Sequence, residues 1–171
     1  MRRYLIYLLD DGVAMNYFGK EEKLYQLFLE ADNKLSPYHS ILLKQIDYIT
    51  KKIPLDRIHR HLASDLGNQV QINSEENVYE IRIDDNNSRA ILVGHSRFLN
   101  LYANGTYEAE TIFFESLRKV EASFLAMDFR PGWSQRATCY KPKQQVQNKH
   151  PSVPGPLAVY HFNSHLLRVS G

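Results

Sequence analysis

The sequence has few of the features that mark exported or membrane-spanning proteins. Only one of its 171 residues is a cysteine, Cys139, which excludes an internal disulfide and suits a reducing compartment. The apolar run at residues 4–9 stops at Asp10. A run of about six residues is too short for the core of a signal peptide or for a membrane span. We therefore expect a cytoplasmic protein.

Motifs that bind phosphates or build a catalytic centre are also missing. The chain has no GxxxxGK loop, no GxGxxG after a strand, no GxSxG and no HExxH. His59 and His61 are two residues apart, which places them on different faces of a helix. Cys139 has no neighbouring base, and Asp128 is better explained as a hydrogen-bonded strand-end carboxylate than as a perturbed catalytic acid. We predict no catalytic residue, no metal ligand and no cofactor.

Acidic residues are absent from the last quarter of the chain. Residues 1–129 carry 15 Lys and Arg against all 19 Asp and Glu, a sum of −4, and residues 130–171 carry six basic residues and no acid, which gives the total of +2. We expect one folded domain over residues 1–129, followed by a basic, proline-containing tail over residues 130–171 that is poorly ordered or loosely packed. A tail of this charge leaves open an alternative function, a regulator that binds nucleic acid through phosphate contacts.

The first half of the domain combines one buried strand with several helices. A continuous apolar run predicts the strand, and apolar residues at helical spacing predict the helices. The strand covers residues 4–9, and the four helices are a short one that ends at Gly19, one that carries Leu24 to Ala31, one from Ser36 to about Lys52, and one from Pro54 to Gly67.

The second half changes to the two-residue period of strands. Alternation over residues 78–83, and short apolar runs at 90–93 and 98–103, predict an antiparallel meander because their connections are short. A helix capped by Thr106 and ending near Val120 follows, and then a buried strand over residues 124–129. The predicted fold class is α/β of the α+β type: a single domain with helices packed on a mainly antiparallel sheet.

Aromatic residues are more numerous than a core of this size needs. The chain has eleven Tyr and eight Phe, and Tyr17, Phe18, Tyr25, Tyr38 and Tyr48 all fall on helices in its first third. Tyrosine joins apolar area to a polar tip and is common at protein interfaces. The pattern is also met if these rings pack in the core with their hydroxyl groups at its rim, so it leaves both interpretations open.

Four segments resemble the SirA family of sporulation inhibitors of replication, in the same order and at similar separations. They are YLIYLL, NYFGKEEKLYQLF, KQIDYITKKIP and YEAETIFFESLRKVEASFLAMDF, and together they cover about residues 1–129. The resemblance implies a monomeric inhibitor, made during sporulation, that binds the N-terminal domain of the replication initiator DnaA and occludes it. Inhibition of this kind requires no chemistry and no direct contact with nucleic acid.

The resemblance also implies which residues form the partner-binding site. The family's contact surface is similar to the positions of Val13 and Tyr17 on the first short helix and of Gln45 and Tyr48 on a later one. These pairs are four and three residues apart, so each pair shares one face of a helix. Val13 stands where the family pattern has a bulkier aromatic residue, and Met15 is a candidate to compensate for it. The sequence from Arg130 onward does not resemble the ending of the family.

Overall fold

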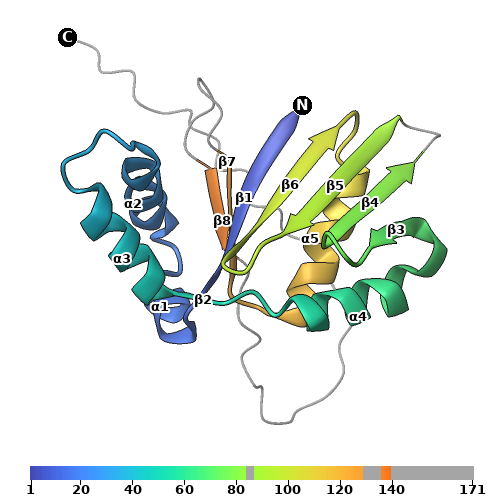
Figure 1. The fold of residues 1–171 in the computed structure, drawn as a ribbon, viewed down its shortest axis with the longest axis horizontal. Helices are drawn as coiled ribbons and strands as arrows, with labels where there is room; N and C mark the ends of the chain where they lie inside the picture. The colour runs from blue at the N-terminus through green and yellow to red at the C-terminus, as the bar shows by residue number, and fades with distance from the viewer. Residues whose placement is uncertain (84–86, 129–135, 140–171) are drawn as a thin grey trace, which may run out of the picture.

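The computed structural model describes residues 1–83, 87–128 and 136–139, which form five α-helices, one 3-10 helix and eight strands (Figure 1). In chain order these elements are β1 (Arg2–Leu9), α1 (Asp11–Tyr17), α2 (Glu21–Asp32), α3 (His39–Ile49), β2 (Thr50–Lys51), α4 (Leu55–Leu66), η1 (Gly67–Gln69), β3 (Val70–Asn73), β4 (Val78–Ile83), β5 (Ser88–Gly94), β6 (Phe98–Asn104), α5 (Glu108–Val120), β7 (Phe124–Asp128) and β8 (Arg136–Cys139).

The strands form one sheet in which every pair is antiparallel. The strand order is β3-β4-β5-β6-β1-β7-β8, and the short β2 pairs with the end of β1. The strand β1 is central, since Ile6 lies opposite both Leu99 of β6 and Ala126 of β7. This arrangement explains the continuous apolar run at residues 4–9 of β1, and it confirms the predicted fold class and the predicted meander of β4, β5 and β6.

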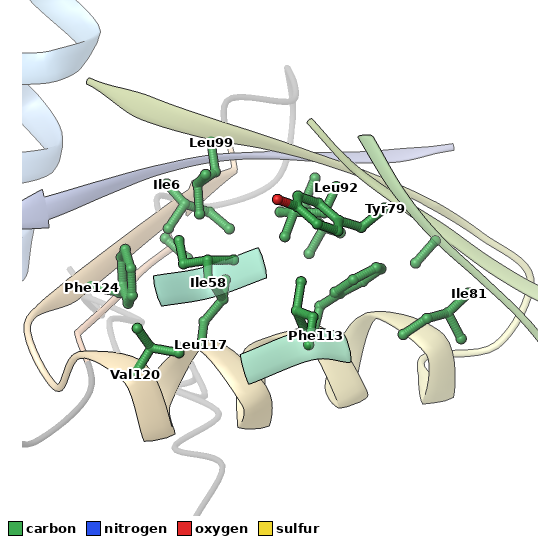
Figure 2. Packing of buried hydrophobic residues seen from close by; sticks show 14 of the residues in the cluster. Ile6, Ile58, Tyr79, Ile81, Leu92, Leu99, Phe113, Leu117, Val120 and Phe124 are labelled. Carbon is green, nitrogen blue, oxygen red and sulfur yellow. The ribbon is translucent and has the colours of Figure 1, made fainter. Parts of the chain in front are cut away.

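The helices cover opposite faces of the sheet, so that the molecule has three layers (Figure 1). Neighbouring residues of β1 enter different cores, because side chains alternate across a strand. Leu8 packs with α4 and α5, and Leu9 packs with α1, α2 and α3. Figure 2 shows the first core, in which side chains from α4 and α5, including Ile58 and Phe113, face the side chains of the sheet. The helices α1, α2 and α3 thus form a layer of their own, which we call the α1–α3 layer.

The start of α5 is stabilised by a distant strand rather than by the predicted cap, Thr106. The helix begins at Glu108, and the flanking Tyr107 makes no side-chain capping bond. Instead, the buried Ser88 of β5 accepts a hydrogen bond from the amide of Ala109 (3.0 Å) and donates its hydroxyl to the carbonyl of Thr106 (3.0 Å). This contact joins α5 to the sheet and satisfies an amide that would otherwise lie unpaired at the helix end.

Two strands lie outside the predicted elements. The strand β3 has only four residues and pairs with β4 at one edge of the sheet. The strand β8 lies beyond the predicted domain boundary at residue 129 and pairs with β7 at the other edge. Most of the predicted tail, residues 130–135 and 140–171, falls outside the described residues, so the division into a domain and a loose tail stays a prediction.

Candidate protein-binding surface

Large hydrophobic side chains reach the surface mainly on the α1–α3 layer. Among the described residues, those exposed from this layer and its connecting turns are Met15, Tyr17, Phe18, Leu29, Leu35, Tyr38, Ile41, Leu43 and Tyr48, whereas only Met1 and Tyr107 are exposed elsewhere. Exposed hydrophobic side chains that lie next to one another are typical of a protein interaction site. The aromatic surplus of the sequence is therefore divided between the cores and this layer.

Helix α3 separates its buried residues from the predicted contact residues. Leu42 and Ile46 are buried against the second core, and they lie on a different side of the helix from Gln45 and Tyr48. Tyr48 is 87% exposed, which is far more than any role in the core would allow. The contact residues predicted from the sequence include Gln45 and Tyr48 but not Ile41, which is 53% exposed. Because Ile41 precedes Gln45 by four residues, its helical spacing could have identified it.

The end of α3 is held rigidly by hydrogen bonds. The hydroxyl of Thr50 donates to the carbonyl of Ile46 (2.7 Å), which closes the last turn. The guanidinium of Arg97, from the turn before β6, donates to the carbonyl of Asp47 (2.7 Å) and to the hydroxyl of Thr50 (3.1 Å), and it forms an ion pair with the Asp47 carboxylate. Tyr48 therefore stands on a fixed backbone, which lowers the backbone entropy that is lost on binding.

Helix α1 is fixed at its start by its own cap and by α3. The carboxylate of Asp10 accepts from the amide of Gly12 (2.9 Å), and the amide of Asp10 donates to the carbonyl of Ile49 at the end of α3 (2.9 Å). The carboxylate of Asp11 accepts from Lys51 Nζ (2.9 Å) and from the hydroxyl of Ser123 (2.9 Å). The hydrogen bond from Lys51, followed by that from Ser123, lowers the pKa of Asp11 below its ordinary value. The start of α1 thus lies against the end of α3 (Figure 1).

The two predicted residues of α1 differ in exposure. Tyr17 is 38% exposed, and Val13 is half-buried and packs against the second core together with Ile49 of α3. Met15 lies about 200° around the helix from Val13. It is exposed beside a surface hollow lined by residues 118–123, so it does not occupy the side of α1 where Val13 packs. Met15 is therefore poorly placed to compensate for the small side chain at position 13.

The residues considered for metal binding or catalysis are not gathered in a site. His59 packs near the ring of Tyr79, with ring centroids 6.2 Å apart, and His61 Nε2 lies 3.8 Å from an Asp65 carboxylate oxygen. Asp128 is buried at the end of β7. In the described ranges, no group of three or more His, Cys, Asp or Glu could hold a metal ion. None of the helices in those ranges is long and apolar enough to cross a membrane.

The fold is that of a small α/β protein with an ordered helical layer that exposes aromatic side chains. Comparison with known proteins supplies the family. The family described as sporulation inhibitor of replication protein SirA matches residues 2–134. The sporulation inhibitor of replication protein SirA of Bacillus subtilis (strain 168) is 36% identical over 137 residues, which cover 77% of this chain and 92% of the relative. The chain therefore belongs to the SirA family, which confirms the resemblance found in the sequence.

Proposed function

We propose that this protein inhibits the initiation of DNA replication during sporulation by binding the N-terminal domain of the initiator DnaA. Membership of a family of sporulation inhibitors of replication supports a role in inhibiting replication during sporulation. The observation that carries the mode of action is the exposure of Tyr48, at 87%, on a helix whose end is fixed by Arg97 and Thr50. An exposed ring on a rigid support is suited to a pocket on a partner and has no use in the protein's own core.

The proposed contact surface combines α1 with α3. Val13 and Ile49 pack against the same core, and the hydrogen bond from Asp10 to Ile49 holds the two helices together. Tyr17 follows Val13 by four residues and lies on the same side of α1. The proposed contact residues are Val13, Tyr17, Gln45 and Tyr48, together with Ile41. When the partner binds this surface, the partner's own contact region is occluded, and no covalent bond is made or broken.

The energy of such a contact rests mainly on the two tyrosines. A tyrosine that becomes a central anchor of an interface typically contributes about 2–4 kcal/mol, or roughly 30-fold to 1,000-fold in affinity. Tyr48 has more exposed surface to bury on binding than Tyr17, because Tyr17 is only 38% exposed in the free protein. Val13 is half-buried and small, so we expect its truncation to cost less than either tyrosine substitution.

The decisive variants are Tyr48→Ala and Tyr17→Ala, measured by calorimetry against the purified N-terminal domain of DnaA. We expect Tyr48→Ala to weaken binding at least about 30-fold. The matched control is Tyr107→Ala, because Tyr107 is 57% exposed at the start of α5, on the other side of the sheet. Circular dichroism should show all three variants folded. Full affinity in both Tyr48→Ala and Tyr17→Ala would exclude this surface.

The alternative function, nucleic-acid binding through the basic residues from Arg130 onward, concerns residues that lie almost entirely outside the described part of the chain. It has its own test, the binding of duplex DNA as salt is raised. Binding that weakens steeply with salt and is lost when residues 140–171 are removed would favour it. A truncated chain that still inhibits replication would count against it.

A further inference from the structure

The end of α3 depends on groups that come from outside the helix. The last four carbonyls of an α-helix have no partner within it, and a positive charge beside them is favourable because of the helix dipole. The last turn of α3 contains no basic residue. Three of its last four carbonyls accept from residues beyond the helix: Ile46 from the Thr50 hydroxyl, Asp47 from the Arg97 guanidinium, and Ile49 from the Asp10 amide. Among these three donors only the guanidinium is charged, so it supplies the cation that the helix lacks.

Arg97 belongs to the turn between β5 and β6, which is itself held in place. The amide of His95 donates to the carbonyl of Phe98 (2.9 Å) across this turn, and the two rings lie with their centroids 4.5 Å apart. The carbonyl of Ser96 accepts from the amide of Ile53 (2.9 Å), which follows β2. The backbone of Arg97 is therefore fixed to the sheet, and its guanidinium joins that fixed backbone to α3.

The contacts of Arg97 lie on both sides of Tyr48 in the chain. Its nitrogen Nη2 donates to the carbonyl of Asp47 (2.7 Å), just before Tyr48, and to the hydroxyl of Thr50 (3.1 Å), two residues after it. The same nitrogen pairs with the Asp47 carboxylate. The side chain of Tyr48 is 87% exposed, so the backbone of α3 sets its position. Helix ends fray when nothing holds them, and a frayed turn has to be ordered again when a partner binds.

We propose that Arg97 is a positioning residue for partner binding, which acts through Tyr48 by holding the end of α3 and makes no contact with the partner. This inference rests on the proposed function and adds a residue from a turn of the sheet to a surface built from helices. When Arg97 is lost, every proposed contact residue is still present. Affinity falls nevertheless, because binding must then order the last turn of α3.

The test compares Arg97→Met with a matched control, Arg57→Met. Arg57 also pairs with a carboxylate, that of Glu121, and donates to the carbonyl of Val120 (3.0 Å) at the end of α5, on the other side of the sheet. Calorimetry of the full-length protein against the N-terminal domain of DnaA should show about tenfold weaker binding for Arg97→Met and a change within about twofold for Arg57→Met. Thr50 is buried and cannot touch a partner, so Thr50→Val removes the other side of the same contact and should also weaken binding.

Two further measurements separate positioning from direct contact. In the free protein, Arg97→Met should speed hydrogen exchange at the amides of Tyr48 and Ile49 about tenfold, whereas Arg57→Met should leave these two amides unchanged. In a protein that already carries Tyr48→Ala, Arg97→Met should change the affinity by less than about twofold, because the effects of residues that act through one another do not add.

The outcomes distinguish this inference from the proposed function. If the wild-type protein does not bind the domain, both are overturned. If Tyr48→Ala loses binding but Arg97→Met binds like the wild type, the contact surface stands and the positioning role is wrong. An equal loss from Arg97→Met with and without Tyr48→Ala would make Arg97 a contact of its own, and an equal loss from Arg57→Met would show a general effect, so either result would overturn the role. If Arg97→Met does not fold, wild-type affinity in Thr50→Val would overturn it.

Discussion

The ion pair between Arg2 and Glu110 offers a sharp test of how β1 is joined to α5. The Glu110 side chain is 3% exposed and the Arg2 side chain 12%, and Arg2 Nε lies 2.8 Å from Glu110 Oε2. The other oxygen of Glu110 accepts from the hydroxyl of Tyr4 (3.0 Å). Glu110→Ala therefore removes the acceptor of two buried donors with one substitution.

The size of the stability loss depends on the hydrogen bonds that the donors keep after the substitution. Breaking a buried pair typically costs about 3–5 kcal/mol. Arg2 still donates to the carbonyls of Gly105 (2.9 Å) and Thr106 (2.8 Å), so its charge is not left bare. We expect a loss near the lower limit, about 3 kcal/mol, which corresponds to a fall of about 6–12 °C in Tm for a chain of this size.

Urea unfolding followed by circular dichroism measures this loss, provided that the slope with urea is unchanged. The matched control is Glu115→Ala on the same helix, because the Glu115–Arg118 pair is more exposed and should contribute less than about 0.5 kcal/mol. A loss below about 1 kcal/mol for Glu110→Ala would refute the reasoning, since the pair would then behave like one on the surface.

Two further predictions concern the stability of the fold. Gly105 has a φ of +73°, and a Cβ built on it would lie 1.7 Å from the carbonyl oxygen of Asn87, so Gly105→Ala should cost more than about 2 kcal/mol. Gly19→Ala, at φ +77° with open space around the site, should cost about 1 kcal/mol, and equal losses in urea unfolding would contradict the clash. Burial raises the pKa of Tyr4, Tyr7 and Tyr79 above the ordinary value near 10. Their contribution to stability is therefore complete below pH 10 and is lost as the pH rises through the higher folded values, and urea midpoints that stay constant from pH 8 to pH 11 would contradict this.

The fold was largely predictable because its main elements have clear local patterns. The run at residues 4–9 indicated a strand buried on both faces, and β1 lies between β6 and β7. The short β3 has too few residues for a clear period, and it is stabilised by pairing with β4. The capping of α5 was also beyond local reasoning, because Ser88 lies 21 residues before the amide that it accepts from.

The candidate site was predictable only through the family resemblance. Helical spacing showed that Gln45 and Tyr48 share a face, but it did not show whether that face is buried. The structure supplies the answer, since Leu42 and Ile46 turn toward the core and Tyr48 does not. The ion pair that fixes the end of α3 was hidden for a similar reason. Sequence alone does not show that Asp47 is occupied by Arg97, a residue 50 positions away.

The central claim is that one surface built from α1 and α3 covers the partner, and a photoreactive residue at position 45 tests it most directly. Gln45 is exposed and lies between Ile41 and Tyr48 on α3. A benzophenone side chain placed there should cross-link to the N-terminal domain of DnaA, and the same group at Arg60 of α4 should not. Cross-linking at position 60 with none at position 45 would contradict the account.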